Sequence, residues 1–238
     1  MDPRKFLKSL FEIAVAKALP SECVPKYLSK LDFTKRTLVF GAGKASAAMA
    51  QAVEQYTSAA LQGLVITRYG YSVECQQIKI IEAGHPVPDK QGVMAAASIL
   101  KTASGLTEKD SVLCLISGGG SSLLSLPAPG LSLNDKKGIT YKLLKCGATI
   151  HEINCVRKHL SAIKGGRLAL ACSPAHLLTL TISDVPCDDL SVIASGPTVA
   201  DPSTFEDALK ILSKYDISEP KSVLKHLENA DDETPKPG

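Results

Sequence analysis

The stretch SVLCLISGGGSSLL, residues 111–124, decides the fold of this chain. Residues 112–116 form an unbroken apolar run, which is typical of a strand that is buried on both faces. Three consecutive glycines follow it, at a large cost in conformational entropy. Strands of this kind occur in sheets that helices cover on both sides, so the stretch predicts an α/β domain.

Four more short apolar runs flank this stretch, and helical patterns alternate with them. The predicted strands are residues 37–40, 63–67, 78–82, 111–116 and 177–182. The predicted helices are residues 45–56, 90–103, 133–146, 151–158, 164–172 and 204–214, and residues 1–19 have an amphipathic helical pattern. This alternation favours a three-layer α/β fold, with a mostly parallel, doubly wound sheet and helices on both faces.

Two further expectations follow from such a sheet. The run LLTLTI, residues 177–182, is as apolar as residues 112–116 and is expected to be buried on both faces. Ligands of doubly wound sheets bind beyond the carboxyl ends of the strands. The chemistry of this chain is therefore expected just after residues 40, 82, 116 and 182.

Composition excludes several function classes. The 238 residues are 45% hydrophobic and 21% charged, which is ordinary for a globular protein with a buried core. The net charge is +3 without a block of Lys or Arg, so nucleic acid and anionic membrane surfaces are not expected as partners. Seven cysteines without a Cys-x-x-Cys pair favour reduced thiols and a cytoplasmic location, and no stretch has the length of a membrane span.

The motif VFGAGKASAAMA, residues 39–50, follows the first predicted strand. Gly41 and Gly43 allow a tight turn into a helix, whose free N–H groups favour an anion, and Lys44 adds a full positive charge. Ala45 after Lys44 departs from a Walker A loop, and Ser46 stands where a dinucleotide fingerprint has its third glycine. The motif therefore predicts a phosphate site, while a tight turn with an exposed lysine remains the alternative.

The motif SGGGSS, residues 117–122, follows the apolar run directly. Successive glycine N–H groups can form a nest for an anion, and serine hydroxyls can bind the same anion. A flexible loop is the alternative, but such loops rarely follow so apolar a strand. We expect phosphate or nucleotide binding by Ser117, Gly118, Gly119, Gly120, Ser121 and Ser122.

Basic residues gather in HEINCVRKHLSAIKGGRLA, residues 151–169. Arg157 and Lys164 are the candidates to bind a carboxylate or phosphate of a substrate. Lys158 and Arg167 are assigned to a solvated helical face.

Carboxylates follow the last predicted strand, in TISDVPCDDLSVIASGPTVADPST, residues 181–204. Asp184 and Asp189 are placed to hold Mg²⁺ or to accept a proton, because Mg²⁺ prefers hard oxygen ligands and usually bridges phosphates. Asp188 is assigned to turn chemistry. His85, in the segment AGHPVPD after the third strand, is assigned to shaping a loop.

The motifs in this order resemble the glycerate 2-kinase family that carries a C-terminal MOFRL-type domain. Bacterial members are often labelled hydroxypyruvate reductases. The resemblance runs from about residue 5 to the end, and the matching segments are GAGKA at 41–45, GHPVPD at 84–89, SGGGSSLL at 117–124, NCVRKHLSAIKGGRLA at 154–169 and SDVPCDDLSVIASGPTVADPST at 183–204. It implies a Rossmann-like N-terminal domain over residues 1–229 and a linker, residues 230–238, to a C-terminal domain that this chain lacks.

The resemblance also implies an activity, namely transfer of the γ-phosphoryl group of ATP to the 2-hydroxyl of D-glycerate with Mg²⁺. Lys44 corresponds to the family's functional lysine and SGGGSS to its ligand-binding loop. In this scheme Lys44 and Asp189 are catalytic, Asp184 binds the metal, and Arg157 and Lys164 bind the substrate. Cys187 and Leu190 depart from the family pattern, which has glycine and proline there.

Two alternatives remain open. A hydroxypyruvate reductase would share the small acid but needs a dinucleotide site, and the missing third glycine disfavours it. The other alternative is a non-catalytic module that binds a nucleotide or anion. The active site of the family lies between two domains, and this chain would supply only one side of it. The chain alone is accordingly expected to have little kinase activity, and the sequence leaves a homodimer open.

Overall fold

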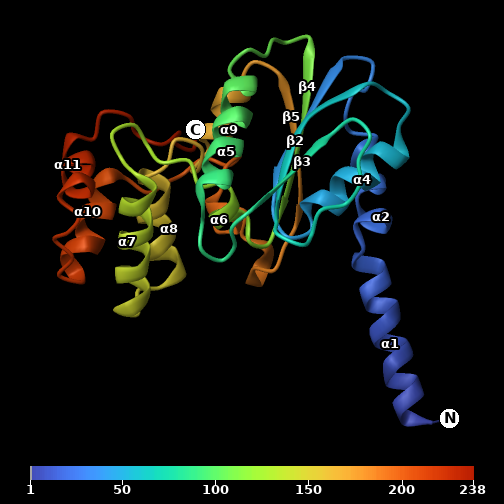
Figure 1. The fold of residues 1–238 in the computed structure, drawn as a ribbon, viewed down its shortest axis with the longest axis horizontal. Coiled ribbons are helices and arrows are strands. Elements are labelled where there is room, and N and C mark those ends of the chain that lie inside the picture. The colour runs from blue at the N-terminus through green and yellow to red at the C-terminus, as the bar shows by residue number, and fades with distance from the viewer. Residues whose placement is uncertain (1) are drawn as a thin grey trace.

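A computed structural model describes residues 2–238 and has a five-stranded parallel sheet at its centre (Figure 1). The strands are β1 (Arg36–Ala42), β2 (Leu61–Arg68), β3 (Lys79–Ala83), β4 (Asp110–Ser117) and β5 (His176–Ile182). Their order in the sheet is β3-β2-β1-β4-β5, and all four neighbouring pairs are parallel. The chain proceeds outward from β1 in one direction and returns to β4 on the other side of β1. The topological switch point therefore lies between the carboxyl ends of β1 and β4, where ligands of such sheets bind.

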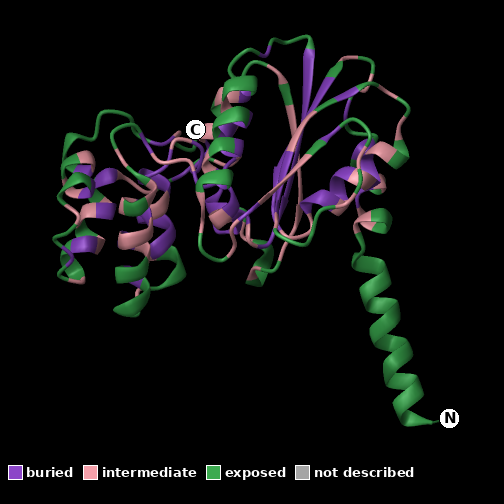
Figure 2. Ribbon diagram, viewed as in Figure 1, coloured by how far each residue is buried: buried purple, intermediate pink, exposed green. Residues whose placement is uncertain are grey.

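Helices cover both faces of the sheet, as the sequence predicted (Figure 1). On one face lie α4 (Ser46–Tyr56) and the short α2 (Pro20–Cys23) and α3 (Pro25–Leu28). On the other lie α5 (Lys90–Ala103), α6 (Gly120–Leu123) and α9 (Arg167–Cys172). Each face has its own buried apolar cluster, and β4 is buried along its whole length (Figure 2). The three-layer α/β prediction is confirmed.

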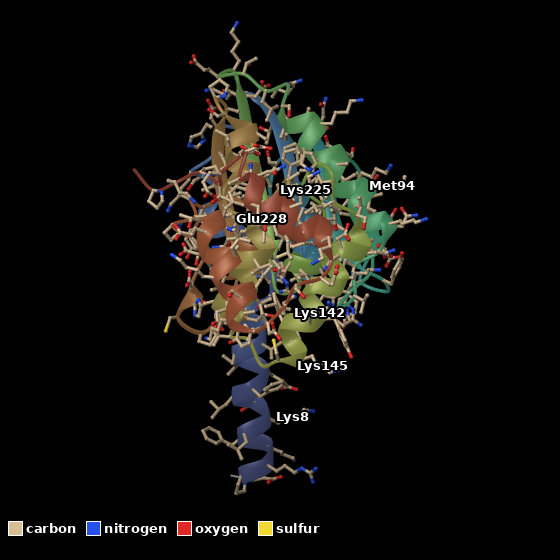
Figure 3. The ribbon with its side chains drawn as sticks, turned by 90° about the vertical axis from the view of Figure 1, so that its left-hand side faces the viewer. Lys8, Met94, Lys142, Lys145, Lys225 and Glu228 are labelled. Atoms are coloured by element: carbon tan, nitrogen blue, oxygen red, sulfur yellow. The ribbon has the colours of Figure 1, made fainter. Side chains whose placement is uncertain are left out.

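Four helices form a separate group beyond the face that α5 and α9 cover (Figures 1 and 3). They are α7 (Leu133–Lys145), α8 (Ile150–His159), α10 (Phe205–Lys214) and α11 (Lys221–Asn229). The group has its own apolar core, and Figure 3 looks onto it, with Lys142 of α7 and Lys225 of α11 at its surface. Capping boxes begin α7, α8 and α10, because a Ser or Thr stands three residues before an acid at each start.

The first helix, α1 (Pro3–Ala18), projects from the body and has no buried residue (Figures 2 and 3). Its start follows from Asp2, whose carboxylate accepts a hydrogen bond from the N–H of Arg4, and from Pro3 in the first turn. None of the helices in residues 2–238 is both long enough and apolar enough to cross a membrane.

Three features differ from or add to the expectations. β5 is an edge strand with intermediate burial, so LLTLTI is not buried on both faces, because no strand among residues 2–238 pairs with its outer edge. The helix α11 was not predicted from the sequence. Residues 230–238, expected to be a linker, turn back onto the body, where Thr234 is buried and the carbonyl of Pro235 accepts a hydrogen bond from Asp201.

Candidate active site

The loops after β1 and β4 are joined by hydrogen bonds at the switch point. The N–H of Lys44 donates to the carbonyl of Gly118 at 2.9 Å, and the N–H of Ala45 donates to the hydroxyl of Ser117 at 3.0 Å. The same hydroxyl lies 3.0 Å from that of Ser46. Ser117 therefore holds the two loops together, and its hydroxyl already has protein partners.

The glycines of this region are required by close approaches of the chain. Gly41 lies within β1, where a Cβ would overlap the carbonyl of Leu115 in β4, so it serves strand packing. A Cβ at Gly118 would overlap the carboxylate of Asp184. Gly119 has a φ of 88°, which favours glycine, and a Cβ there would lie 2.8 Å from the ring of His85.

An exposed ion pair stands over the glycine loop. The Nζ of Lys44, from the β1 loop, lies 3.4 Å from the Oδ2 of Asp184, two residues past β5. Their side chains are 40% and 55% exposed, so an incoming ligand can reach both charges. The predicted catalytic lysine and the predicted metal ligand are thus brought together, although they are 140 positions apart in the sequence.

His85 joins this group, although the sequence analysis assigned it to a structural loop. It follows β3, its ring packs at Gly119, and its Nδ1 is buried without a hydrogen-bond partner. Burial and the positive charges of Lys44 and Arg68 lower the pKa of His85, which favours the neutral ring. The signal in the sequence was its position directly after a predicted strand end.

The two serines of the loop are also engaged. The hydroxyl of Ser122 donates to the carbonyl of Gly119 at 3.1 Å. The hydroxyl of Ser121 lies 2.8 Å from that of Ser195, which donates to Asn154 at 3.0 Å. These bonds fix the glycine loop against α8 and against the segment that follows β5.

That segment has left-handed backbone at four residues that are not glycine. They are Cys187, Asp188, Ala194 and Ser195, with φ between 51° and 61°. Such conformations concentrate at functional sites. Cys187 stands where the family pattern has glycine, and its φ of 61° explains that preference.

Asp189 is not brought to the ion pair by the structure. Its carboxylate accepts a hydrogen bond from the N–H of Ser191 at 2.8 Å. The side chain and the N–H of Ser191 are the main causes that lower the pKa of Asp189, and Lys158 of α8 contributes to the shift. The geometry therefore favours Asp184 over Asp189 as the carboxylate nearest the phosphate loop.

Arg157 and Lys164 lie together in a cavity of about 410 Å³, which we term the cationic cavity. Two loop serines, Ser121 and Ser122, also line it, so it adjoins the glycine loop. A second buried lysine lies there, Lys136 of α7, which was not predicted because nothing in its helical pattern distinguishes it from a surface lysine.

The assignment of Lys158 to a solvated face is wrong. Its Nζ lies 3.2 Å from the Oδ1 of Asp201, and both side chains are buried. Arg167, assigned to the same face, binds the carboxylate of Asp232 and has an 11% exposed side chain. The helical pattern placed both residues on a polar face. It could not show their acidic partners, which come from segments that are distant in the sequence.

Metal ligands are few at the site. Within residues 2–238 no group of three His, Cys, Asp or Glu side chains is close enough to hold an ion. Asp184 is a single hard oxygen ligand beside a loop suited to phosphate. Mg²⁺ is usually held by one or two carboxylates together with phosphate oxygens and water, so this donor set fits Mg²⁺ that arrives with a nucleotide.

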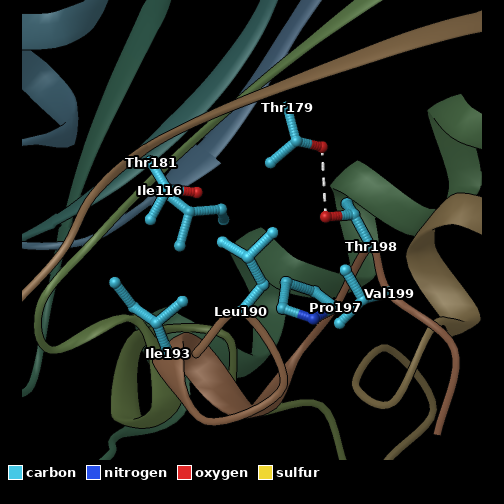
Figure 4. A pocket seen from close by; sticks show the side chains of 8 residues that line it. All are labelled: Ile116, Thr179, Thr181, Leu190, Ile193, Pro197, Thr198 and Val199. Carbon is cyan, nitrogen blue, oxygen red and sulfur yellow. Dashed lines mark hydrogen bonds between the residues drawn. The ribbon is translucent and has the colours of Figure 1, made fainter. Parts of the chain in front are cut away.

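A second hollow, of about 220 Å³, lies between β5 and the segment that contains Leu190 and Ile193 (Figure 4). Its only drawn hydrogen bond joins the hydroxyls of Thr179 and Thr198 at 3.0 Å. No charged side chain of the described residues lines this hollow, so it does not suit an anion.

Comparison with known proteins gives a consistent set of relatives. A family model described as "Domain of unknown function (DUF4147)" matches residues 6–228. An Agrobacterium vitis protein with the provisional name hydroxypyruvate reductase is 51% identical over 99% of this chain and 53% of its own length. The D-glycerate 2-kinase of Thermotoga maritima is 43% identical over 99% of this chain and 57% of its own.

The fold comparison agrees. The crystal structure of a glycerate kinase from Thermotoga maritima matches with a TM-score of 0.89 at 43% identity, over 99% of this chain and 57% of that one. The chain spans about half the length of the curated relatives it matches.

Proposed function

Because the chain belongs to the DUF4147 family, we propose that it forms the phosphoryl-binding part of a glycerate 2-kinase. The reaction is transfer of the γ-phosphoryl group of ATP to the 2-hydroxyl of D-glycerate. The observation that carries the proposal is the Lys44–Asp184 pair at 3.4 Å above a glycine loop that leaves no room for side chains. The 43% identity to a D-glycerate 2-kinase supports the choice of acceptor.

In this proposal Lys44 stabilises the charge that develops on the transferred phosphoryl group. Phosphoryl transfer depends mainly on positioning and on neutralising the equatorial oxygens. Lys44 can exchange its contact with Asp184 for a phosphate oxygen, because both side chains are reachable from solvent. The N–H groups of Gly119 and Gly120 add fixed partial positive charge beside it.

Asp184 then has two roles open to it, as a ligand of Mg²⁺ and as an acceptor for the proton of the 2-hydroxyl. Bound Mg²⁺ would supply a cation that neutralises the phosphate oxygens, and Asp184 is the residue placed to hold it. Asp189 keeps the catalytic role assigned to it only if the loop after β5 rearranges. Arg157 and Lys164 are proposed to bind the anionic part of a substrate.

The proposal includes a second domain and a cytoplasmic setting, the latter on the sequence grounds given above. The active site of the proposed enzyme lies between two domains, so turnover requires the second one. A homodimer stays compatible with this scheme.

A hydroxypyruvate reductase is disfavoured because the third glycine of the dinucleotide-binding fingerprint is missing. Ser46 stands at that position, is fully buried, and has its hydroxyl against that of Ser117. NADH oxidation with hydroxypyruvate by the complete protein would favour the reductase, and ATP binding without turnover by the complete protein would favour the non-catalytic module.

The test is Lys44→Ala in the complete two-domain protein, assayed by ADP release with D-glycerate and ATP. We expect kcat to fall by about 10² or more, the usual effect of removing a preorganised donor. Lys35→Ala, which removes a half-buried lysine at the opposite end of β1, is the matched control and should keep its rate. An unchanged rate in Lys44→Ala would remove this lysine from the mechanism.

A further inference from the structure

The cationic cavity carries more positive charge than its surroundings compensate. Among residues 2–238, four basic side chains line it, namely Lys136, Lys137, Arg157 and Lys164, and no carboxylate does. Lys136 is 6% exposed and Lys164 is 1% exposed. A buried charge without a partner is unfavourable, so an arrangement of this kind indicates a ligand of opposite charge.

Each of these cations has unused hydrogen-bond donors. The Nζ of Lys136 donates to the carbonyl of Leu126 at 3.2 Å, and the Nζ of Lys164 donates to the carbonyl of Ala194 at 3.2 Å. An ammonium group has three donors, so each lysine retains two. The guanidinium of Arg157 has five donors and makes no hydrogen bond or ion pair with any of residues 2–238.

Burial lowers the pKa of Lys136, Arg157 and Lys164, and the positive charges of neighbouring groups add to this for the two lysines. Burial, together with the charge of Arg157, lowers the pKa of Lys136 to about 7. Burial, together with the charges of Lys136 and Arg157, lowers the pKa of Lys164 well below its usual value. The remaining polar lining consists of serine, threonine and tyrosine hydroxyls, none of which compensates a cation at pH 7.

The rim of the cavity has a different character from its floor. Val87, Tyr141 and Leu144 line it and are between 58% and 66% exposed. A volume of about 410 Å³ falls in the range of sites for ligands much larger than a three-carbon acid. An aromatic ring at the rim and cations at the floor suit a molecule with a flat apolar part and a highly charged part.

We propose that Lys136, Arg157 and Lys164 form the floor of a nucleoside triphosphate site, in which they bind the phosphate chain and Tyr141 contacts the base. This inference rests on the proposed kinase function and assigns the nucleotide to the cationic cavity. Ser121 and Ser122 line the cavity, so a phosphate chain on its floor continues toward the glycine loop, to which the N–H of Lys44 is hydrogen-bonded from the β1 loop. In this arrangement D-glycerate, the acceptor, binds on the other side of the glycine loop, next to Asp184.

The test measures binding of ATP by calorimetry, without turnover, to the complete two-domain protein and to its Lys136→Met and Lys164→Met variants. We expect each variant to weaken ATP binding by about tenfold or more, the loss of one charge-assisted hydrogen bond. Lys145→Met removes an exposed lysine from the same helix and should leave the affinity unchanged.

Two probes separate the parts of the proposal. Inorganic tripolyphosphate should bind more weakly than ATP and lose affinity in the same variants, whereas Tyr141→Ala should weaken ATP but not tripolyphosphate. Binding of either anion should take up protons, measured in two buffers of different ionisation enthalpy, because the anion favours charged Lys136 and Lys164. A merely structural role of the two lysines would not produce this uptake.

Two outcomes would overturn the assignment. If Lys136→Met and Lys164→Met fold normally and bind ATP as the parent does, the cavity is not the nucleotide site. If they lose D-glycerate binding instead, the floor binds the carboxylate of the acceptor. Either result leaves the kinase proposal intact, since that proposal depends on turnover and on Lys44.

Discussion

Two neighbouring residues of α8 have opposite electrostatic surroundings. Lys158 is buried with its ammonium 3.2 Å from Asp201, whereas Arg157 faces the cationic cavity, where no carboxylate lies. A buried charge with an acidic partner is accounted for by the fold itself. A group of buried charges without one is accounted for only by something that binds there. The presence or absence of a carboxylate partner therefore distinguishes a structural cation from a ligand-binding one. Burial alone does not distinguish them.

The largest effect on stability is expected at the buried ion pair of Lys158 and Asp201. Asp201→Asn leaves the ammonium of Lys158 buried without a carboxylate and should lower the free energy of unfolding by about 3–5 kcal/mol. Urea unfolding followed by circular dichroism measures it. Glu206→Gln, in the exposed pair with Lys210, is the control and should leave the transition unchanged. A small effect of Asp201→Asn would remove the distinction between the two kinds of cation.

An effect of opposite sign is expected in the cationic cavity. Lys164→Met replaces a buried lysine that has no carboxylate partner by an apolar side chain of similar length and should raise the free energy of unfolding by about 1 kcal/mol or more. The pKa of Lys164 is lowered by folding, so the unfavourable contribution of the lysine is present below its unfolded pKa and disappears above it. The gain over the parent should accordingly be larger at pH 7 than at pH 10. A loss of stability at pH 7 would contradict the assignment of this lysine to ligand binding.

The smallest effect on stability is expected at a third cation, Arg36, which has a carboxylate partner but a partly exposed side chain. Its guanidinium lies 2.6 Å from Asp110 and is the main cause that lowers the pKa of this carboxyl to about 2. Because folding lowers that pKa, the stabilisation is present above the unfolded value near pH 4 and is lost as the pH falls toward 2. The stability difference between the parent and Asp110→Asn should therefore be constant above pH 5 and decrease below pH 4. A difference that does not change with pH would mean that the carboxylate is not stabilised by this pair.

The sequence predicted the sheet well because its signals are local. The apolar runs and the glycines after β1 and β4 are readable from a few neighbouring residues, and the alternation with helices predicts that the strands are parallel. The order β3-β2-β1-β4-β5 was not predicted and comes from the structure. The edge position of β5 was not readable, since its composition equals that of a central strand and only its neighbours decide its burial.

The site was predictable only in part for the same reason. Lys44, the glycine loop and Asp184 each follow a strand, and parallel strands bring their ends together. Lys136 and Lys158 lie within helices, where sequence periodicity marks a polar face and does not show what packs on it. Asp201, which compensates Lys158, is 43 positions away, and no pattern in the sequence connects the two.

The hydrogen bonds between the β1 and β4 loops have a consequence for the thermodynamics of binding. The N–H of Lys44 and the hydroxyl of Ser117 tie both main chains before any ligand arrives. Ordering on association is then confined to side chains, mainly those of Lys44 and Asp184, at about 0.5–1.5 kcal/mol for each rotamer that is immobilised. The conformational entropy of the two backbone segments is lost during folding, so association at this loop does not carry that cost again.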